Sequence, residues 1–301
     1  MRIGIFSGST NDGTIDQLVD EAKTAEAQGF AGFYVSQIFG HDALTALAVI
    51  GREVPRIELG TGVVPTYPRH PMMLAQQALT VNAASAGRLA LGIGLSHKLV
   101  VESMWGLSYD KPVRHLREYL SVLMPLLDGS NVAFDGDDYR VHAGVSLPVV
   151  QRPGVFVAAL GEQMLRVTGA LADGTVTWCT GPETLRTHIV PTLNAAAEAA
   201  GRPKPRVISA LPVCVSQDKA GAVARAAELF QVYGFLPSYR AMLDKEGAAG
   251  PEDVAIVGNE AEVADRIRAL ADIGVTDFTA SEFGGNPDEV ERTRELLKTL
   301  L

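Results

Sequence analysis

Residues Arg56–Ser96 read RIELGTGVVPTYPRHPMMLAQQALTVNAASAGRLALGIGLS, and this stretch predicts a strand, a loop, a helix and a second strand. The predicted strands, near 57–64 and 89–94, are apolar on both faces, which is typical of parallel strands covered by helices. Glycines lie near the C-terminal ends of both strands, where another group often approaches the backbone closely. Because α/β folds build their sites at this end of the strands, we expect a functional site here.

The same alternation of strands and helices extends in both directions from this stretch. It predicts eight strands in all, near residues 3–6, 32–36, 57–64, 89–93, 155–159, 175–178, 207–215 and 275–280. Eight strands alternating with helices indicate an α/β fold, a single TIM-type (β/α)8 barrel domain over residues 1–301.

Two segments depart from the plain alternation. Residues 132–141, VAFDGDDYRV, predict a short β-hairpin. We expect it to form an insertion at about 129–153, between the fourth helix and the fifth strand, that crosses the top of the barrel. The long helical region before the last strand is interrupted at Gly234 and Pro237, and we expect its part around Tyr233 and Tyr239 to cover the barrel mouth.

Composition restricts the class of protein. The net charge of −9 argues against a nucleic-acid surface and against binding to an anionic membrane. The chain has no signal-peptide pattern and no apolar run of membrane-spanning length, so we expect a cytoplasmic protein. The two cysteines, Cys179 and Cys214, lie in apolar stretches and are expected to be buried. No spacing typical of metal ligands is present, and no metal is predicted.

Two further features could carry chemistry. Gly161, Glu162, Gln163 and Met164 begin a helix directly after the fifth strand, and the free backbone N–H groups of a helix start suit a phosphate. His97 follows the fourth strand, where a histidine can act as an acid, as a base or simply as a solvated loop residue. The segment LGIGLS lacks the third glycine of a dinucleotide-binding loop, which excludes a nicotinamide-type fold.

The segments LGTGV, YPRHP and SAGRLALGIG together resemble the luciferase-like (bacterial-luciferase-type) family, in particular its branch that uses the deazaflavin coenzyme F420. The hairpin segment VAFDGDDYRV resembles this family as well. The resemblance implies an F420-dependent oxidoreductase that moves a hydride between the deazaflavin and a small organic substrate, with reduction of an electrophilic double bond as the expected reaction. It also makes a homodimer plausible. Two alternatives remain open, which are a monooxygenase that uses flavin mononucleotide (FMN) and a coenzyme-binding protein without turnover.

The resemblance also implies where the site lies. The peptide bond Gly62–Val63 is expected to be a non-prolyl cis bond in a bulge that supports one face of the ring. The residues expected around the ring are Ser36, Gln37, Thr61, Gly62, Val63, Gly94 and Leu95, while Gly161, Glu162, Gln163 and Met164 are expected to hold the phosphate-bearing tail. Among the remaining aromatic residues, Phe39, Tyr67, Trp105 and Trp178 are candidates for the substrate pocket.

One departure from the family pattern concerns proton transfer. Many deazaflavin-dependent relatives have an Asp-His pair after the second strand, whereas this chain has Gln37-Ile38 in the segment Ser36–Phe39. Glutamine and isoleucine cannot transfer protons as a carboxylate and an imidazole do. We therefore assign the catalytic proton donor to His97, with His41 or a tyrosine as alternatives. The substrate could also require no acid from the protein.

Overall fold

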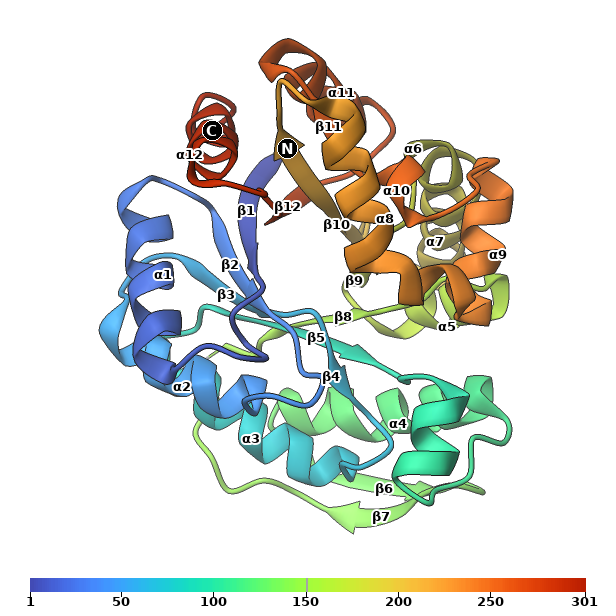
Figure 1. Ribbon diagram of the computed structural model, residues 1–301. Coiled ribbons are helices and arrows are strands. Elements are labelled where there is room, and N and C mark those ends of the chain that lie inside the picture. Colours follow the sequence, from blue (N-terminus) through green and yellow to red (C-terminus); the bar gives the residue numbers. More distant parts are fainter. Residues whose placement is uncertain (150) are drawn as a thin grey trace.

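The computed structural model describes residues 1–149 and 151–301, and its centre is a closed barrel of eight parallel strands (Figure 1). These strands are β1 (Arg2–Ser7), β2 (Gly32–Val35), β3 (Glu58–Thr61), β5 (Leu89–Gly94), β8 (Gly154–Val157), β9 (Gly174–Trp178), β10 (Arg206–Val215) and β12 (Asp277–Glu282). The barrel closes because β1 pairs with both β2 and β12. The predicted TIM-type fold and its eight strands are confirmed.

In the described residues, ten longer helices and several short ones surround this barrel. The longer ones are α1 (Ile15–Ala27), α2 (Ala43–Glu53), α3 (Pro71–Ala84), α4 (Pro112–Leu127), α5 (Glu162–Leu171), α7 (Val190–Ala199), α8 (Lys219–Phe235), α9 (Pro237–Glu246), α11 (Glu260–Asp272) and α12 (Pro287–Lys298). The others are α6 (Pro182–Thr184), α10 (Pro251–Val254) and the π-helical turns η1 (Val100–Met104) and η2 (Leu185–Ile189). Within the described ranges, no helix combines the length and the apolar character that a bilayer crossing requires.

Two short strands were not predicted as separate elements. β4 (Val64–Pro65) follows a bulge after β3 and pairs with β5. β11 (Ile256–Gly258) lies outside the closed ring and pairs in parallel with the C-terminal part of β10. Elements of two or three residues are too short to show a hydrophobic period, so the sequence pattern could not reveal them.

The predicted hairpin is present as β6 (Val132–Asp135) and β7 (Arg140–Ala143), but it does not cross the top of the barrel. Figure 1 shows it on the outer side of α3 and α4. The buried Glu118 of α4 fixes it there, because its carboxylate accepts hydrogen bonds from the backbone N–H groups of Asp137 and Asp138 at 3.0 and 2.7 Å. The expected position was wrong because this side-chain contact, rather than the hairpin pattern, decides where the insertion packs.

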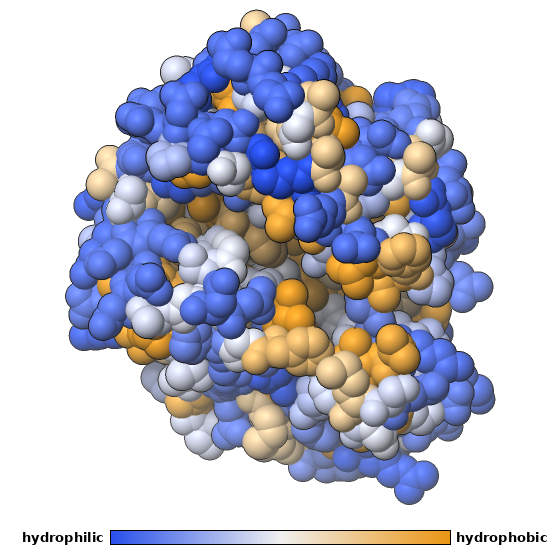
Figure 2. All heavy atoms as spheres, in the orientation of Figure 1, coloured by the Kyte–Doolittle hydropathy of each residue, from blue (hydrophilic) through white to orange (hydrophobic). Residues whose placement is uncertain are grey.

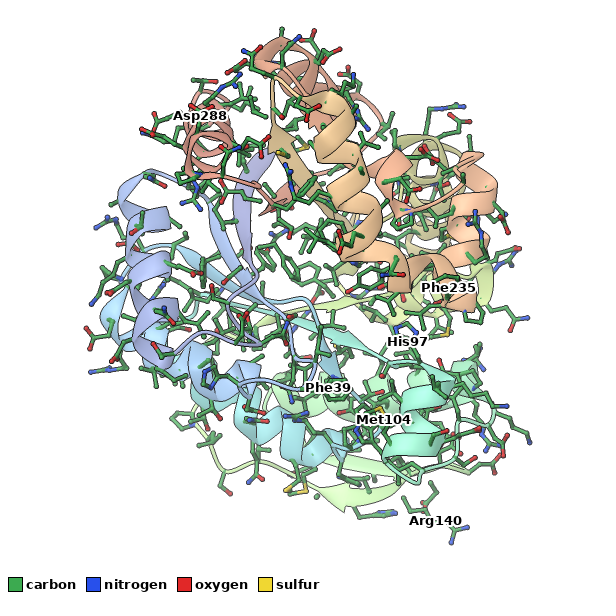
Figure 3. All side chains as sticks on the ribbon, viewed as in Figure 1. Phe39, His97, Met104, Arg140, Phe235 and Asp288 are labelled. Carbon is green, nitrogen blue, oxygen red and sulfur yellow. The ribbon has the colours of Figure 1, made fainter. Side chains whose placement is uncertain are left out.

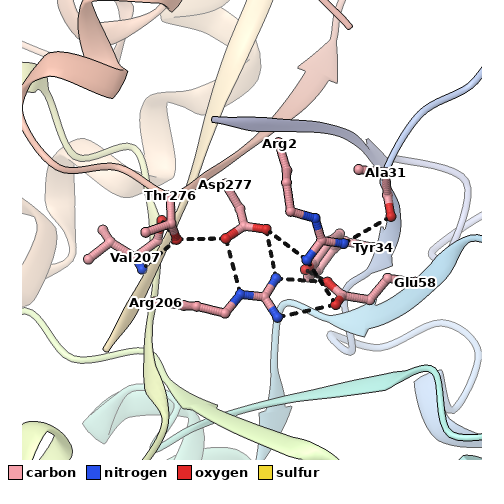
Figure 4. A network of polar contacts seen from close by, with 8 residues as sticks. All are labelled: Arg2, Ala31, Tyr34, Glu58, Arg206, Val207, Thr276 and Asp277. Carbon is pink, nitrogen blue, oxygen red and sulfur yellow. Dashed lines mark hydrogen bonds and ion pairs between the residues drawn. The ribbon is translucent and has the colours of Figure 1, made fainter. Parts of the chain in front are cut away.

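A network of charged side chains fills the N-terminal end of the barrel (Figure 4). Arg206 lies between Asp277 and Glu58, with shortest nitrogen–oxygen distances of 2.6 and 2.9 Å. Arg2 contacts both acids, and the hydroxyl of Tyr34 donates to Glu58 at 2.7 Å. This end of the barrel is therefore occupied by paired charges.

Above this network, a layer of mostly apolar side chains fills the barrel interior. Tyr34, Ala90, Phe156, Val176 and Ile208 form a buried cluster, and Phe6, Val63 and Ala158 pack on it. The guanidinium carbon of Arg206 lies 4.9 Å from the centre of the Phe156 ring, which joins the two layers. The apolar layer forms the floor of the cavity at the C-terminal end of the strands.

Candidate active site

The C-terminal ends of the strands enclose a cavity with two adjoining chambers. The α5 chamber has a volume of about 190 Å³ and extends to Gly161 and Met164 at the start of α5. The α8 chamber has a volume of about 450 Å³ and extends from the loop after β2 to the end of α8. Residues common to both walls are Phe6, Gly62, Val63, Ser96, His97, Trp178 and Tyr239. Figure 2 shows the hollow in the middle of this face, with pale and orange residues along its walls.

The bulge after β3 forms the wall that the two chambers share. The peptide bond Gly62–Val63 is cis, as predicted. The backbone N–H of Gly62 donates to the carbonyl oxygen of Val35 at 2.9 Å, which ties the bulge to β2. A Cβ atom at Gly94 would lie only 2.6 Å from Cγ2 of Val63, so glycine is needed where β5 passes the bulge. The glycines singled out in the sequence therefore allow Val63 to lie in the cavity wall.

His97 lies in the wall of both chambers, directly after β5. The centre of its ring is 5.8 Å from that of Tyr239 in α9. Partial burial lowers the pKa of His97, so the neutral imidazole is favoured near neutral pH. The alternative donor His41 is held elsewhere, with its Nε2 atom 2.7 Å from the carbonyl oxygen of Gly13, and it does not line either chamber.

The end of α8 and the start of α9 cover the cavity, as expected for the region around Tyr233 and Tyr239. Tyr233 packs edge-on against Trp178 and Tyr239, with ring centres 5.7 and 5.0 Å apart. At the far end of α9, the carboxylate of Glu246 accepts hydrogen bonds from the N–H groups that begin α6, the closer being that of Thr184 at 2.7 Å. These contacts hold α9 over the barrel.

The N-terminus of α5 opens toward the α5 chamber. Gly161 precedes the helix in an extended conformation and has no side-chain cap. A Cβ atom at this position would meet no heavy atom within 4 Å, so the space beside the helix start is open. The unpaired N–H groups of the first turn and the positive end of the helix dipole can bind an anion there.

Most of the residues predicted for the site line the cavity. They are Ser36, Gln37, Phe39, Gly62, Val63, Gly94, Leu95, His97, Trp105, Gly161, Met164 and Trp178. The side-chain oxygen of Gln37 also accepts a hydrogen bond from the backbone N–H of Ala43 at 3.2 Å, which fixes the loop before α2.

Four predicted residues direct their side chains elsewhere. Thr61 is buried between β3 and β5, and Tyr67 stacks on His115 with ring centres 4.0 Å apart. The Glu162 carboxylate pairs with Arg166 on the same helix at 2.6 Å, and Gln163 lies in a groove beside α4. Thr61 and Tyr67 therefore support the site from outside the cavity, while Glu162 and Gln163 can contribute only backbone N–H groups.

Several cavity residues were missed at the sequence level. Phe6 at the end of β1 stacks on Trp178 with ring centres 5.7 Å apart, and Ser281 stands at the end of β12. Their positions at the C-terminal ends of strands could have identified both. Leu99, Val232 and Leu236 carried no such signal, because apolar helix and loop residues are indistinguishable in sequence from core residues. Among the described residues, no cluster of three or more His, Cys, Asp or Glu side chains could hold a metal ion.

Comparison with known proteins gives a consistent result. A family model described as luciferase-like monooxygenase matches residues 1–277. The chain is 28% identical over 280 residues to a 5,10-methylenetetrahydromethanopterin reductase of Methanolobus tindarius, which covers 92% of this chain and 85% of the relative. It is 27% identical to an F420-dependent glucose-6-phosphate dehydrogenase of Intrasporangium calvum, over 86% of each chain. The coenzyme F420-dependent tetrahydromethanopterin reductase of Methanopyrus kandleri has the same fold, with a TM-score of 0.83, 22% identity, and coverage of 100% of this chain and 98% of that one.

Proposed function

Because this chain belongs to the luciferase-like monooxygenase family, we propose that it is an F420-dependent oxidoreductase that transfers a hydride between the deazaflavin and an organic substrate. The F420-dependent glucose-6-phosphate dehydrogenase of Intrasporangium calvum supports this choice of coenzyme. The observation that carries the proposal is one cavity in which the Gly62–Val63 bulge and the open start of α5 line the same chamber.

The residues of the α5 chamber fit such a coenzyme. Val63 and Gly94 present neither a polar nor a bulky side chain to the chamber, so a flat ring can lie against them. The start of α5 offers backbone N–H groups to a phosphate of the tail, and Gly161 leaves that approach open. Ser36 and Gln37 line the adjoining α8 chamber, so the substrate would lie between them and the ring.

When bound, the coenzyme supplies the hydride chemistry, and the protein orients the reactants and handles the proton. Reduction of an electrophilic double bond requires one hydride and one proton, and we assign the proton to a ring nitrogen of His97. Tyr239 lies beside His97 and the end of α8 covers the chamber, which would limit the access of water to the place where the proton moves.

A binding titration tests the coenzyme assignment. Oxidised F420 and FMN are titrated in parallel into the wild-type protein and into Gly161→Asp and Gly161→Asn variants, with fluorescence as the readout. We expect micromolar or tighter binding of F420, about −8 kcal/mol. Gly161→Asp should weaken it at least about tenfold by placing a carboxylate beside the phosphate, while Gly161→Asn, of the same shape but neutral, should weaken it less.

Each outcome of the titration has a defined meaning. Both substitutions place a good helix cap at a position with space for it, so neither should destabilise the fold. Preference for FMN would favour the monooxygenase alternative. Binding of F420 without turnover of any tested substrate would favour a coenzyme-binding protein, and binding of neither coenzyme would contradict the proposal.

We also propose that the protein is a homodimer. The support is the family resemblance alone. Sedimentation velocity distinguishes a species of 32.0 kDa from one of twice that mass. A single species at the monomer mass at micromolar concentration would contradict the proposal.

A further inference from the structure

The walls of the α8 chamber carry no formal charge near neutral pH. Within the described ranges, none of the residues lining either chamber is Asp, Glu, Lys or Arg, and the pKa of His97 is lowered by burial. A carboxylate or phosphate that enters such a chamber loses its hydration without gaining an opposite charge, which disfavours binding. The helix start that could bind an anion lies in the other chamber, where the proposed coenzyme would occupy it.

The entrance of the α8 chamber is apolar although it faces solvent. Ile38, Phe39, Leu99 and Val232 line the chamber and expose 48%, 65%, 68% and 52% of their surface. They come from three separate elements, which are the loop after β2, the turn before η1 and the end of α8. Figure 3 shows Phe39 and Met104 on one side of His97 and Phe235 on the other.

Exposed apolar side chains from three elements that meet at one cavity mark a ligand groove more often than scattered single residues do. The polar side chains that line the chamber are neutral, among them Asn11, Gln37 and Ser281. They can form hydrogen bonds with one or two polar atoms of a ligand, but they cannot compensate an ionic group.

We infer that the substrate is an uncharged and predominantly apolar molecule. Its body contacts Ile38, Phe39, Leu99 and Val232, and its reacting group lies beside His97. The assignment of this ligand as substrate rests on the proposed function, whereas the preference for an uncharged ligand rests only on the chamber. A phosphorylated sugar, such as the substrate in the name of the Intrasporangium calvum relative, would not be accepted here.

A matched pair of fluorescent probes tests this inference in the absence and in the presence of the coenzyme. N-Phenyl-1-naphthylamine and 8-anilinonaphthalene-1-sulfonate share one aromatic skeleton and differ by a sulfonate. Each is titrated into the protein of residues 1–301, alone and with saturating F420. We expect the neutral probe to bind at least about tenfold more tightly than the anionic probe, a difference of about 1.4 kcal/mol.

Two variants locate the binding. Phe39→Lys places a cation at the entrance, and the exposed side chain allows the change without loss of folding. It should weaken the neutral probe and strengthen the anionic probe, each at least about threefold. Met73→Lys makes the same change at an exposed apolar position on α3, outside the chamber, and should leave both affinities unchanged.

The inference is overturned if the anionic probe binds to the wild-type protein as tightly as the neutral one, or if the neutral probe does not bind. It is also overturned if Phe39→Lys and Met73→Lys have the same effect. If the probes behave as expected but F420 does not bind, the uncharged ligand site is supported and the proposed function fails. The two conclusions are therefore tested separately.

Discussion

The hydroxyl of Thr61 forms two hydrogen bonds with the backbone of Gly92, donating to the carbonyl oxygen at 2.7 Å and accepting from the N–H at 2.8 Å. The Thr61 side chain thus takes the place of backbone hydrogen bonds between β3 and β5 at the point where the bulge begins. Thr61 was predicted to contact the coenzyme. The structure instead places its side chain behind the wall that the coenzyme would contact.

Replacement of Thr61 should therefore affect both stability and the cavity wall. Thr61→Val removes the hydroxyl while keeping the shape, and leaves two buried backbone groups without partners. We expect it to lower the free energy of unfolding by about 2 kcal/mol and to weaken coenzyme binding. Thr61→Ser retains the hydroxyl and should bind the coenzyme like the wild type. Urea unfolding and the F420 titration measure the two effects, and a Val variant with wild-type stability would contradict the assignment.

The charged network at the N-terminal end of the barrel should be important for stability but not for binding. Asp277 exposes 6% of its side chain and accepts two hydrogen bonds from Arg206, at 3.1 and 2.6 Å. Asp277→Asn leaves this guanidinium partly uncompensated, and we expect a loss of about 3 kcal/mol. Asp265→Asn in the exposed pair with Arg268 is the control and should change stability by less than about 0.5 kcal/mol. Equal losses of unfolding free energy in the two variants, measured by urea unfolding, would show that the network stabilises the fold no more than an exposed ion pair does.

His115 should make stability depend on pH. Burial lowers the pKa of His115 from 6.5 to about 4, because the buried imidazole loses hydration when it is charged. Below pH 6.5 the unfolded chain binds a proton that the folded protein does not, so the free energy of unfolding decreases as the pH falls toward 4. Between pH 7 and pH 5 this effect amounts to about 2 kcal/mol.

A substitution isolates this contribution. His115→Asn should remove about 2 kcal/mol of the decrease between pH 7 and pH 5, although the variant itself is less stable at pH 7 because the stacking on Tyr67 is lost. His142→Asn, at an exposed position of β7, is the control for replacing a histidine elsewhere in the chain. Urea unfolding at the two pH values gives the comparison. An unchanged decrease in the His115 variant would contradict the prediction.

His97 should affect turnover rather than coenzyme binding. His97→Gln can still form hydrogen bonds but cannot transfer a proton, so we expect kcat for substrate reduction to fall by about 100-fold or more. The Kd of F420 should change by less than about twofold. Because burial lowers the pKa of His97, the proton-donating imidazolium forms only below the ordinary value of 6.5, and the wild-type kcat should rise as the pH falls in that range. The Gln variant should lose this dependence.

A second variant separates His97 from its neighbour. Tyr239→Phe removes the hydroxyl of the tyrosine whose ring centre lies 5.8 Å from that of His97, and it should leave most of the activity. If Tyr239→Phe abolishes turnover while His97→Gln does not, the tyrosine is the proton donor. Steady-state kinetics over the pH range, with the F420 titration for each variant, distinguish these outcomes.

The sequence alone determined the barrel and the wall of its site. The eight strands could be predicted because parallel strands covered by helices are continuous apolar runs, and such runs are visible in a single sequence. The cis bond at Gly62–Val63 was predicted from the resemblance of its flanking segments, and the open helix start at Gly161 from its position after a strand. These features depend on local sequence.

Only the tertiary structure decided which side chains face the cavity. Both faces of a parallel strand are buried, so an apolar pattern does not tell the barrel interior from the helix-facing side. The pattern could therefore not show that Thr61 points to β5, or that Tyr67 packs on His115. It also could not show that Val232 of α8 meets Phe39 at one entrance, since these residues are far apart in the chain and are brought together by the closing of the barrel. Such contacts depend on the packing of residues that are distant in the sequence, and local sequence patterns do not predict this packing.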